Sequence, residues 1–400
     1  MSVKRGRNFL MAPGPTNIPE RVLRAMQRPA VELSSPDFVA LCLGCLADLK
    51  KVFRTDGRVF VYAANGHGAW EAALSNTLSP GDRVLAFETG VFSEAWARMA
   101  EALGAEAVLV PGDWRHGIDA DAVEKHLEAD RAHRIRAVLA IQTDTATGIT
   151  SDVPAVRRAM DAAGHPALLM VDAVASLAAT DFRMDEWGVD VAVGASQKAL
   201  MSPPGLAFTA VNDKALARSD EAKVPRLYWD WRKRLDEEFY TWFCGTAPEH
   251  LLFALREALD MIAEEGLEAI FARHRRIGAA VRAAVAVWAQ AGALSLNAAR
   301  PAEQSDSVST IRVDERWDAV EIRTLCQERL NVSLGGGLGK LKGRAFRIGH
   351  MGDINEPMIL GALGGVETAL RLCRVPHARG ALNAAIESLA EERHPALAAR

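Results

Sequence analysis

The sequence has few cysteines, and their spacing excludes most cysteine-based sites. The five cysteines are scattered, and only Cys42 and Cys45 form a C-x-x-C pair. A zinc or redox site built on such a pair needs a second pair, which the sequence lacks. Both cysteines lie in an apolar helical pattern, so we expect buried thiols on a helix and no metal site. Reduced thiols are typical of the cytoplasm, where we expect the protein to be.

Long apolar runs and an excess of basic charge are also missing. No stretch is long enough to span a bilayer, and the apolar part of the N-terminus is too short for a secretory signal. The chain carries 47 basic and 51 acidic residues, with a net charge of −4 and no basic block. These features argue against a membrane partner and against a nucleic-acid partner.

Strands and helices are expected to alternate through the first half of the 400 residues, which is typical of the α/β class. Solid apolar runs in such an alternation predict a mainly parallel sheet with helices on both faces. The predicted strands are residues 59–62, 83–87, 107–110, 137–142, 167–171 and 189–193. Ligands of such sheets bind at the carboxyl ends of the strands.

The remaining segments predict an arm and a smaller second domain. Three prolines and a glycine in residues 8–19 predict a rigid arm without regular structure. Residues 215–250 are charged, tryptophan-rich and poorly periodic, and we expect a surface excursion or a dimer contact there. The later strands alternate in polarity, which indicates an α+β domain. We predict an arm at 1–19, a large domain at 20–275 and a small domain at 276–400.

Chemical side chains gather at one predicted sheet edge. Asp172 directly follows one strand, and Lys198 lies just after the next, before a Pro-Pro-Gly turn at 203–205. Residues 63–71 place a glycine-containing turn between a strand and a helix, where free N–H groups bind anions. A lysine and a carboxylate beside such a turn suit pyridoxal phosphate. Taken singly, each feature also fits a plainer role: a surface lysine, a helix cap and turn glycines.

Several motifs together resemble the class V, fold-type I aminotransferases, specifically the alanine–glyoxylate and serine–glyoxylate branch. They are APGPTNIP at 12–19, WEAALSNTL at 70–78, ATG at 146–148, VDAVAS at 171–176, GASQKA at 194–199, PPG at 203–205 and RIGHMG at 347–352. The resemblance implies a mainly parallel seven-stranded sheet between helices, a smaller α+β C-terminal domain and pyridoxal 5′-phosphate as cofactor. It also implies a homodimer, or a dimer of dimers, with shared active sites.

The resemblance assigns a role to twelve residues of this chain. Lys198 is implied to be the Schiff-base lysine and proton shuttle, and Asp172 the partner of the pyridine nitrogen. Arg347 is implied to grip the substrate carboxylate, as a planar guanidinium can with two parallel bonds, and Asn17 to border the substrate. The other contacts with the cofactor are implied for Asn65, Gly66, His67, Phe92, Thr145, Val174, Gln197 and Thr246, the last donated by a second subunit.

The implied activity is ping-pong transamination of serine, alanine or aspartate, with glyoxylate or pyruvate as acceptor. The chain departs from the family pattern at Leu33 and Ser34, at Thr143 and Asp144, and at Phe243, so the donor stays open. Alternatives are an unusual donor, as in ureidoglycine–glyoxylate or pyridoxamine–pyruvate aminotransferases, and a lyase. A desulfurase would need a mobile catalytic cysteine, for which Cys244 is the one candidate. A phosphate-metabolite binding protein without turnover is the alternative outside enzymes.

Overall fold

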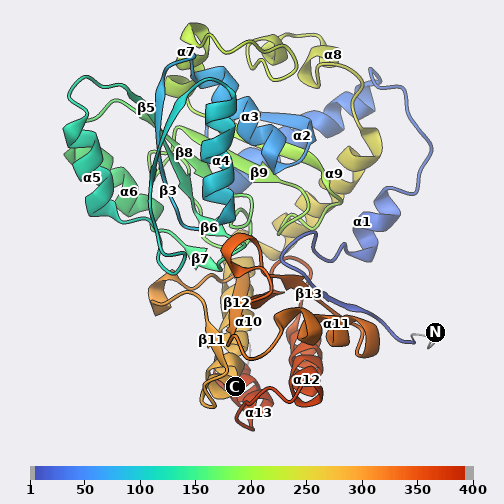
Figure 1. The fold of residues 1–400 in the computed structure, drawn as a ribbon. Helices are drawn as coiled ribbons and strands as arrows, with labels where there is room; N and C mark the ends of the chain where they lie inside the picture. The colour runs from blue at the N-terminus through green and yellow to red at the C-terminus, as the bar shows by residue number, and fades with distance from the viewer. Residues whose placement is uncertain (1–4, 392–400) are drawn as a thin grey trace.

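The computed structural model describes residues 5–391, which form a large α/β part and a smaller C-terminal part (Figure 1). The outermost residues of the predicted arm and small domain, 1–4 and 392–400, lie outside the described residues. The sheet of the large part has seven strands, which confirms the predicted fold class. In spatial order they are β2 (Arg58–Ala64), β10 (Gly205–Val211), β9 (Val191–Ala195), β8 (Leu168–Asp172), β5 (Ile135–Ile141), β3 (Arg83–Phe87) and β4 (Glu106–Val110).

All neighbouring strands of this sheet are parallel except β10, which runs antiparallel to both β2 and β9. The carboxyl ends of β2, β9, β8, β5 and β3 therefore meet at one edge. Successive strand residues enter different cores: Leu169 and Val171 join one apolar cluster, whereas Leu168 and Met170 join the other. Such alternation buries both faces, which explains why these strands are apolar throughout.

Helices cover both faces of this sheet. One face carries α3 (Gly66–Thr77), α4 (Val91–Ala102) and α7 (Asp213–Glu221). The other carries α2 (Pro36–Phe53), α5 (Ala120–Ala129), α6 (Val153–Ala162) and α9 (Glu249–Glu265). Cys42 and Cys45 are 2% and 1% exposed on α2, and burial raises the pKa of each thiol to about 12. The expected buried thiols on a helix are confirmed.

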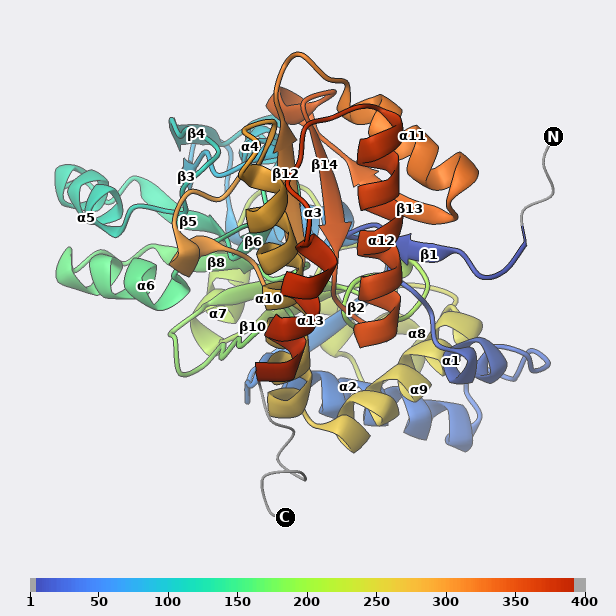
Figure 2. The ribbon, with the colours of Figure 1, turned by 90° about the horizontal axis from the view of Figure 1, so that it is seen from below.

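The C-terminal part has a five-stranded sheet that includes the N-terminal arm. Its order is β1 (Phe9–Met11), β13 (Val332–Gly336), β14 (Ala345–Gly349), β12 (Val308–Val313) and β11 (Leu294–Leu296). The prediction that the arm lacks regular structure is wrong for β1, which pairs in parallel with β13 (Figure 2). The three prolines come after this strand, so its N–H groups are free to pair.

Four helices complete the C-terminal part: α10 (Leu267–Ala289), α11 (Ala319–Arg329), α12 (Glu356–Leu372) and α13 (Ala381–Glu391). Helix α10 joins the two parts, because Ile270 packs in the core of the large part and Ile277 in that of the small part. The predicted boundary after residue 275 falls inside this helix and stays a prediction. The short elements are α1 (Glu20–Ala25), β6 (Thr143–Asp144), β7 (Ile149–Thr150), η1 (Lys233–Leu235), α8 (Phe239–Trp242), η2 (Pro301–Glu303) and η3 (Gly339–Leu341).

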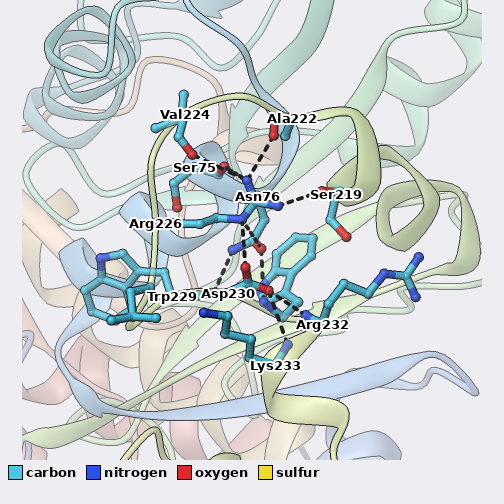
Figure 3. Close-up of polar contacts among 12 residues, drawn as sticks. Ser75, Asn76, Ser219, Ala222, Val224, Arg226, Trp229, Asp230, Arg232 and Lys233 are labelled. Carbon is cyan, nitrogen blue, oxygen red and sulfur yellow. Dashed lines mark hydrogen bonds and ion pairs between the residues drawn. The ribbon is translucent and has the colours of Figure 1, made fainter.

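The tryptophan-rich segment is anchored in the large part rather than being a simple surface excursion. Trp231 is fully buried, stacks on Phe60 and donates from its indole to the Tyr62 hydroxyl at 2.8 Å. Arg226 donates to the side-chain oxygen of Asn76 at 2.9 Å and to four backbone carbonyls, as Figure 3 shows. A guanidinium with five acceptors fixes this loop in place. Because the loop lacks hydrophobic periodicity, the sequence pattern did not reveal this anchor. Within residues 5–391, none of the helices has the length and apolar character of a membrane span.

Candidate functional site

A cavity of about 300 Å³ lies at the sheet edge where the parallel strands end. Cavities of this size are typical of sites for small ligands. It is lined by Gly14, Pro15, Asn65, Gly66, His67, Trp70, Phe92, Thr143, Thr145, Asp172, Val174, Ala175, Gln197, Lys198 and Pro204. Nine of the twelve predicted site residues are among them, so the tertiary structure brings most of the prediction together in one place.

Lys198 is held over the cavity by a tight turn after β9 and by the N-terminal arm. Ser196 fixes the turn by donating from its hydroxyl to the Pro203 carbonyl at 2.6 Å. The Thr16 hydroxyl donates to the Lys198 carbonyl at 2.8 Å, and the Lys198 ammonium donates to the carbonyl of Pro13. A Cβ on Gly14 would overlap the lysine side chain, so only glycine lets the arm pass this closely.

Burial, together with the nearby Arg347 cation, lowers the pKa of Lys198 to about 8. The carboxylates of Asp172 and Asp144 oppose this shift. A lysine with this pKa is neutral in a substantial fraction of molecules near neutral pH, which a nucleophile or base requires.

Asp172 ends β8 with a carboxylate that is 5% exposed and held on both oxygens. Oδ1 accepts from the Val174 N–H at 2.6 Å, and Oδ2 accepts from the indole N–H of Trp70 at 3.1 Å. Burial raises the pKa of Asp172 to about 7, and the nearby Asp144 raises it too, whereas the two hydrogen bonds and Lys198 oppose the shift. The carboxylate is thus fixed in direction and ready for a cationic partner.

The turn between β2 and α3 presents the start of a helix to the cavity. Asn65 caps the helix, because its Oδ1 accepts from the backbone N–H groups of His67 at 3.1 Å and Gly68 at 3.3 Å. The N–H of Gly66 and the side-chain NH₂ of Asn65 have no partner among the described residues. Free donors at a helix N-terminus form a ready site for an anion such as phosphate.

An aliphatic side chain and a group of aromatic rings form two walls of the cavity. Val174 packs close to the turn, since a Cβ on Gly66 would come within 3.1 Å of its methyl group. Phe92 belongs to an aromatic group with His67 and Trp70, with ring centroids 6.4 and 6.2 Å from its own. Burial lowers the pKa of His67, so this ring acts as a neutral wall.

One polar side chain of the cavity is buried and unpaired within residues 5–391. The side-chain oxygen of Gln197 is buried there without a hydrogen-bond partner. Buried polar groups in proteins are normally satisfied, so this oxygen indicates that a polar ligand belongs in the cavity.

Arg347 lies on β14 in the C-terminal part and bonds to the cavity residue Thr145, although it does not itself line the cavity. It is 8% exposed and donates from Nε to the Gly336 carbonyl at 2.7 Å and from Nη1 to the Thr145 carbonyl at 2.8 Å. Nη2 has no partner among the described residues. Burial lowers the pKa of Arg347 to about 10, which leaves the guanidinium charged at neutral pH. The free end of an anchored guanidinium suits a carboxylate.

Two predicted site residues lie away from the cavity within this chain. Asn17 donates from its side chain to the Leu10 carbonyl at 3.0 Å, so it holds the arm in place. Thr246 is exposed, beyond the end of α8. No cysteine lines the cavity in the described part of the chain, and Cys244 lies in the same segment as Thr246.

Sequence reasoning missed Trp70 and the arm residues around Gly14. Trp70 stands in an alanine-rich helix, where an aromatic residue predicts core packing, and indeed it is 2% exposed. Its hydrogen bond to Asp172 depends on how α3 lies across β8, which no local pattern reveals.

The comparisons with known proteins agree with this geometry. The family described as aminotransferase class-V matches residues 47–340. The chain is 45% identical over 371 residues to a serine–glyoxylate aminotransferase of Methylorubrum extorquens, covering 91% of each chain. It is also 45% identical to an L-aspartate–glyoxylate aminotransferase of Paracoccus denitrificans, covering 91% of this chain and 90% of the relative. The crystal structure of a pyridoxamine–pyruvate aminotransferase from Mesorhizobium loti has a TM-score of 0.90 at 26% identity, covering 98% of this chain and all of that one.

Proposed function

The chain belongs to the class-V aminotransferases, enzymes that use pyridoxal phosphate, and we propose that it transfers the amino group of serine or aspartate to glyoxylate. The observation that carries the proposal is the placement of Lys198 and Asp172 in one cavity, with the guanidinium of Arg347 bonded to the cavity residue Thr145. Relatives with these two donors are equally similar to the chain, and both use glyoxylate as acceptor. Alanine as donor and pyruvate as acceptor remain in the panel to be tested.

The residues of the cavity fit pyridoxal phosphate in charge and shape. The unpaired donors of Asn65 and Gly66 at the start of α3 would hold the phosphate, with the amide of Gln197 beside them. Val174 and Phe92 would enclose the two faces of the ring. The hydroxyl of Thr145 would meet a polar group of the ring.

Asp172 would pair with the ring nitrogen. Alone, this carboxylate has a raised pKa because it is buried, and a cationic partner would return it to the charged form. Its hydrogen bonds from Val174 and Trp70 point it at one place, so no reorganisation is needed during the reaction.

The cofactor, when bound, supplies an electron sink for the electrons left at the substrate α-carbon. The chain supplies the proton transfer. The lowered pKa of Lys198 lets its Nζ take a proton as a neutral amine and release it again, and the arm carbonyl of Pro13 orients this amine. Because burial is the main cause of the lowered pKa, closing the cavity to water favours the basic form.

Arg347 would bind the substrate α-carboxylate. Its two bonds to backbone carbonyls leave Nη2 and one N–H of Nη1 pointing away, so the carboxylate would receive two parallel bonds. Such a clamp places the α-carbon in a fixed orientation, which turns the reaction into an effectively intramolecular one.

We also propose a homodimer in which Thr246 reaches the phosphate site of a second subunit. Thr246 is exposed, and the apolar side chains of Leu227 and Tyr240 nearby in the sequence are 63% and 61% exposed. Large exposed apolar side chains support a protein contact. Sedimentation velocity at assay concentrations tests this proposal, and a fully active monomer would contradict it.

The experiment for the function is labelling followed by a substrate panel. Pyridoxal phosphate is bound, reduced with borohydride and the modified peptide mapped; we expect the label on Lys198. Serine, aspartate and alanine are then tested against glyoxylate and pyruvate. Label on another lysine, or no visible chromophore, would overturn the site. Release of sulfide from cysteine faster than amination of glyoxylate would overturn the reaction.

A further inference from the structure

Helix α4 has no side chain at its N-cap, although the hydroxyl of Ser93 in its first turn accepts the N–H groups of Thr89 and Gly90. Gly90 stands at its N-cap, and a glycine has no side-chain acceptor for the first N–H groups. The carboxylate of Asp144, from strand β6, takes this place: its Oδ2 accepts the backbone N–H of Phe92 at 3.1 Å. A charged cap of this kind also interacts favourably with the positive end of the helix dipole.

The second oxygen of the same carboxylate holds a different segment. Oδ1 accepts the backbone N–H of Ala146 at 2.8 Å, next to Thr145. Asp144 is 1% exposed and does not line the cavity itself, whereas Phe92 and Thr145 both do. One buried carboxylate thus ties Phe92 to the segment that contains Thr145, and both residues line the cavity.

The glycine and the carboxylate fit each other. A Cβ on Gly90 would overlap the carboxyl group of Asp144, so this cap forms only with glycine at that position. The same network extends to the substrate arginine, because Arg347 donates to the carbonyl of Thr145 at 2.8 Å. The Asp144 carboxylate also opposes the lowering of the pKa of both Arg347 and Lys198 by burial, which favours the charged forms of these two residues.

We propose that Asp144 is a positioning residue for the cofactor site: one carboxylate oxygen fixes Phe92 by accepting its N–H, and the other fixes the segment of Thr145 by accepting the N–H of Ala146. The carboxylate is required because both of its oxygens accept. An asparagine keeps one acceptor but turns an NH₂ group toward the second N–H. The inference rests on the cofactor site proposed above. It adds to that site the residue that fixes the positions of Phe92 and Thr145 relative to each other.

The test measures the apoprotein's affinity for pyridoxal phosphate, the visible circular dichroism of the bound cofactor, and kcat and KM. The variants are Asp144→Ala, Asp144→Asn and Gly90→Ala. The matched control is Asp152→Ala, which removes an exposed carboxylate cap from α6, where it accepts the Ala155 N–H at 2.9 Å. Both aspartate variants lose a helix cap, but only one cap lies behind the cavity.

We expect Asp144→Ala to weaken cofactor binding at least about tenfold and to reduce the visible dichroic band, since small displacements in a site carry large costs. Gly90→Ala is expected to match it, Asp144→Asn to fall between it and the unchanged protein, and Asp152→Ala to stay within twofold. Equal affinity and equal dichroism in Asp144→Ala and Asp152→Ala would overturn the proposal. If Asp144→Ala does not fold, an unchanged affinity in both Asp144→Asn and Gly90→Ala overturns it instead. Absence of cofactor binding by the unchanged protein would mean that the site is wrong, not the role of Asp144.

Discussion

Replacing Arg347 by lysine tests the assignment of the substrate carboxylate most directly. The guanidinium uses Nε and one N–H of Nη1 for the carbonyls of Gly336 and Thr145, and its other end is free. Lysine keeps the charge but has a single ammonium group, which cannot hold both carbonyls and also form two parallel bonds to a carboxylate.

The size of the effect follows from the number of bonds lost. A hydrogen bond to a charged group contributes about 1.5–3 kcal/mol, and the lysine retains one of the two. A loss of about 2–3 kcal/mol corresponds to a fall in kcat/KM of about 30- to 150-fold, mainly through KM.

The assay compares serine with ethanolamine, which has the same amine and hydroxyl but no carboxylate. The rate of the absorbance change is measured for both amines on the enzyme loaded with pyridoxal phosphate. We expect Arg347→Lys to lose its preference for serine over ethanolamine by the same factor as kcat/KM, with unchanged cofactor affinity. The matched control is Arg323→Lys on α11, the neighbouring cation that lowers the pKa of Arg347 but makes no bond to the cavity segments.

Two results would refute this reasoning. One is a change of less than about threefold in the KM for serine, because a lost charge-assisted bond must cost more than that. The other is an equal loss of rate for serine and ethanolamine, which would mean that Arg347 supports the cavity wall through Thr145 rather than binding the carboxylate.

Two further predictions concern stability. Arg226→Met removes the donor to four backbone carbonyls and one of the two donors to the side-chain oxygen of Asn76, so it should lower the free energy of unfolding by about 3–5 kcal/mol (Figure 3). Arg232→Met removes an exposed pair with Asp220 and should cost no more than about 1 kcal/mol. Urea unfolding measures both, and equal costs would contradict the anchoring role of Arg226. His274 is fully buried, and burial lowers its pKa to about 4, so its unfolded form binds more protons between pH 6.5 and 4. The stability that neutral His274 contributes above pH 6.5 is lost as the pH falls, by about 2 kcal/mol between pH 7 and pH 5. In urea unfolding at several pH values, His274→Gln should lack that part of the pH dependence. An unchanged pH dependence in the variant would rule this prediction out.

The sequence determined the class of fold, the cofactor and the reaction type. Apolar strands that alternate with helices predict a mainly parallel sheet, and such a sheet collects the residues after its strands at one edge. Asp172 and Lys198 follow neighbouring strands β8 and β9, so their meeting could be derived without coordinates.

The tertiary structure alone decided which side chains hold these groups in place. The indole of Trp70 on Asp172, the Pro13 carbonyl on Lys198 and the Asp144 carboxylate behind Phe92 each join segments far apart in the chain. Local spacing records the direction of a side chain on its own strand or helix, but not which distant element packs against it. The chemistry of the site can therefore be predicted from several short motifs taken together. The rigidity of the site comes from contacts that form only once the chain has folded.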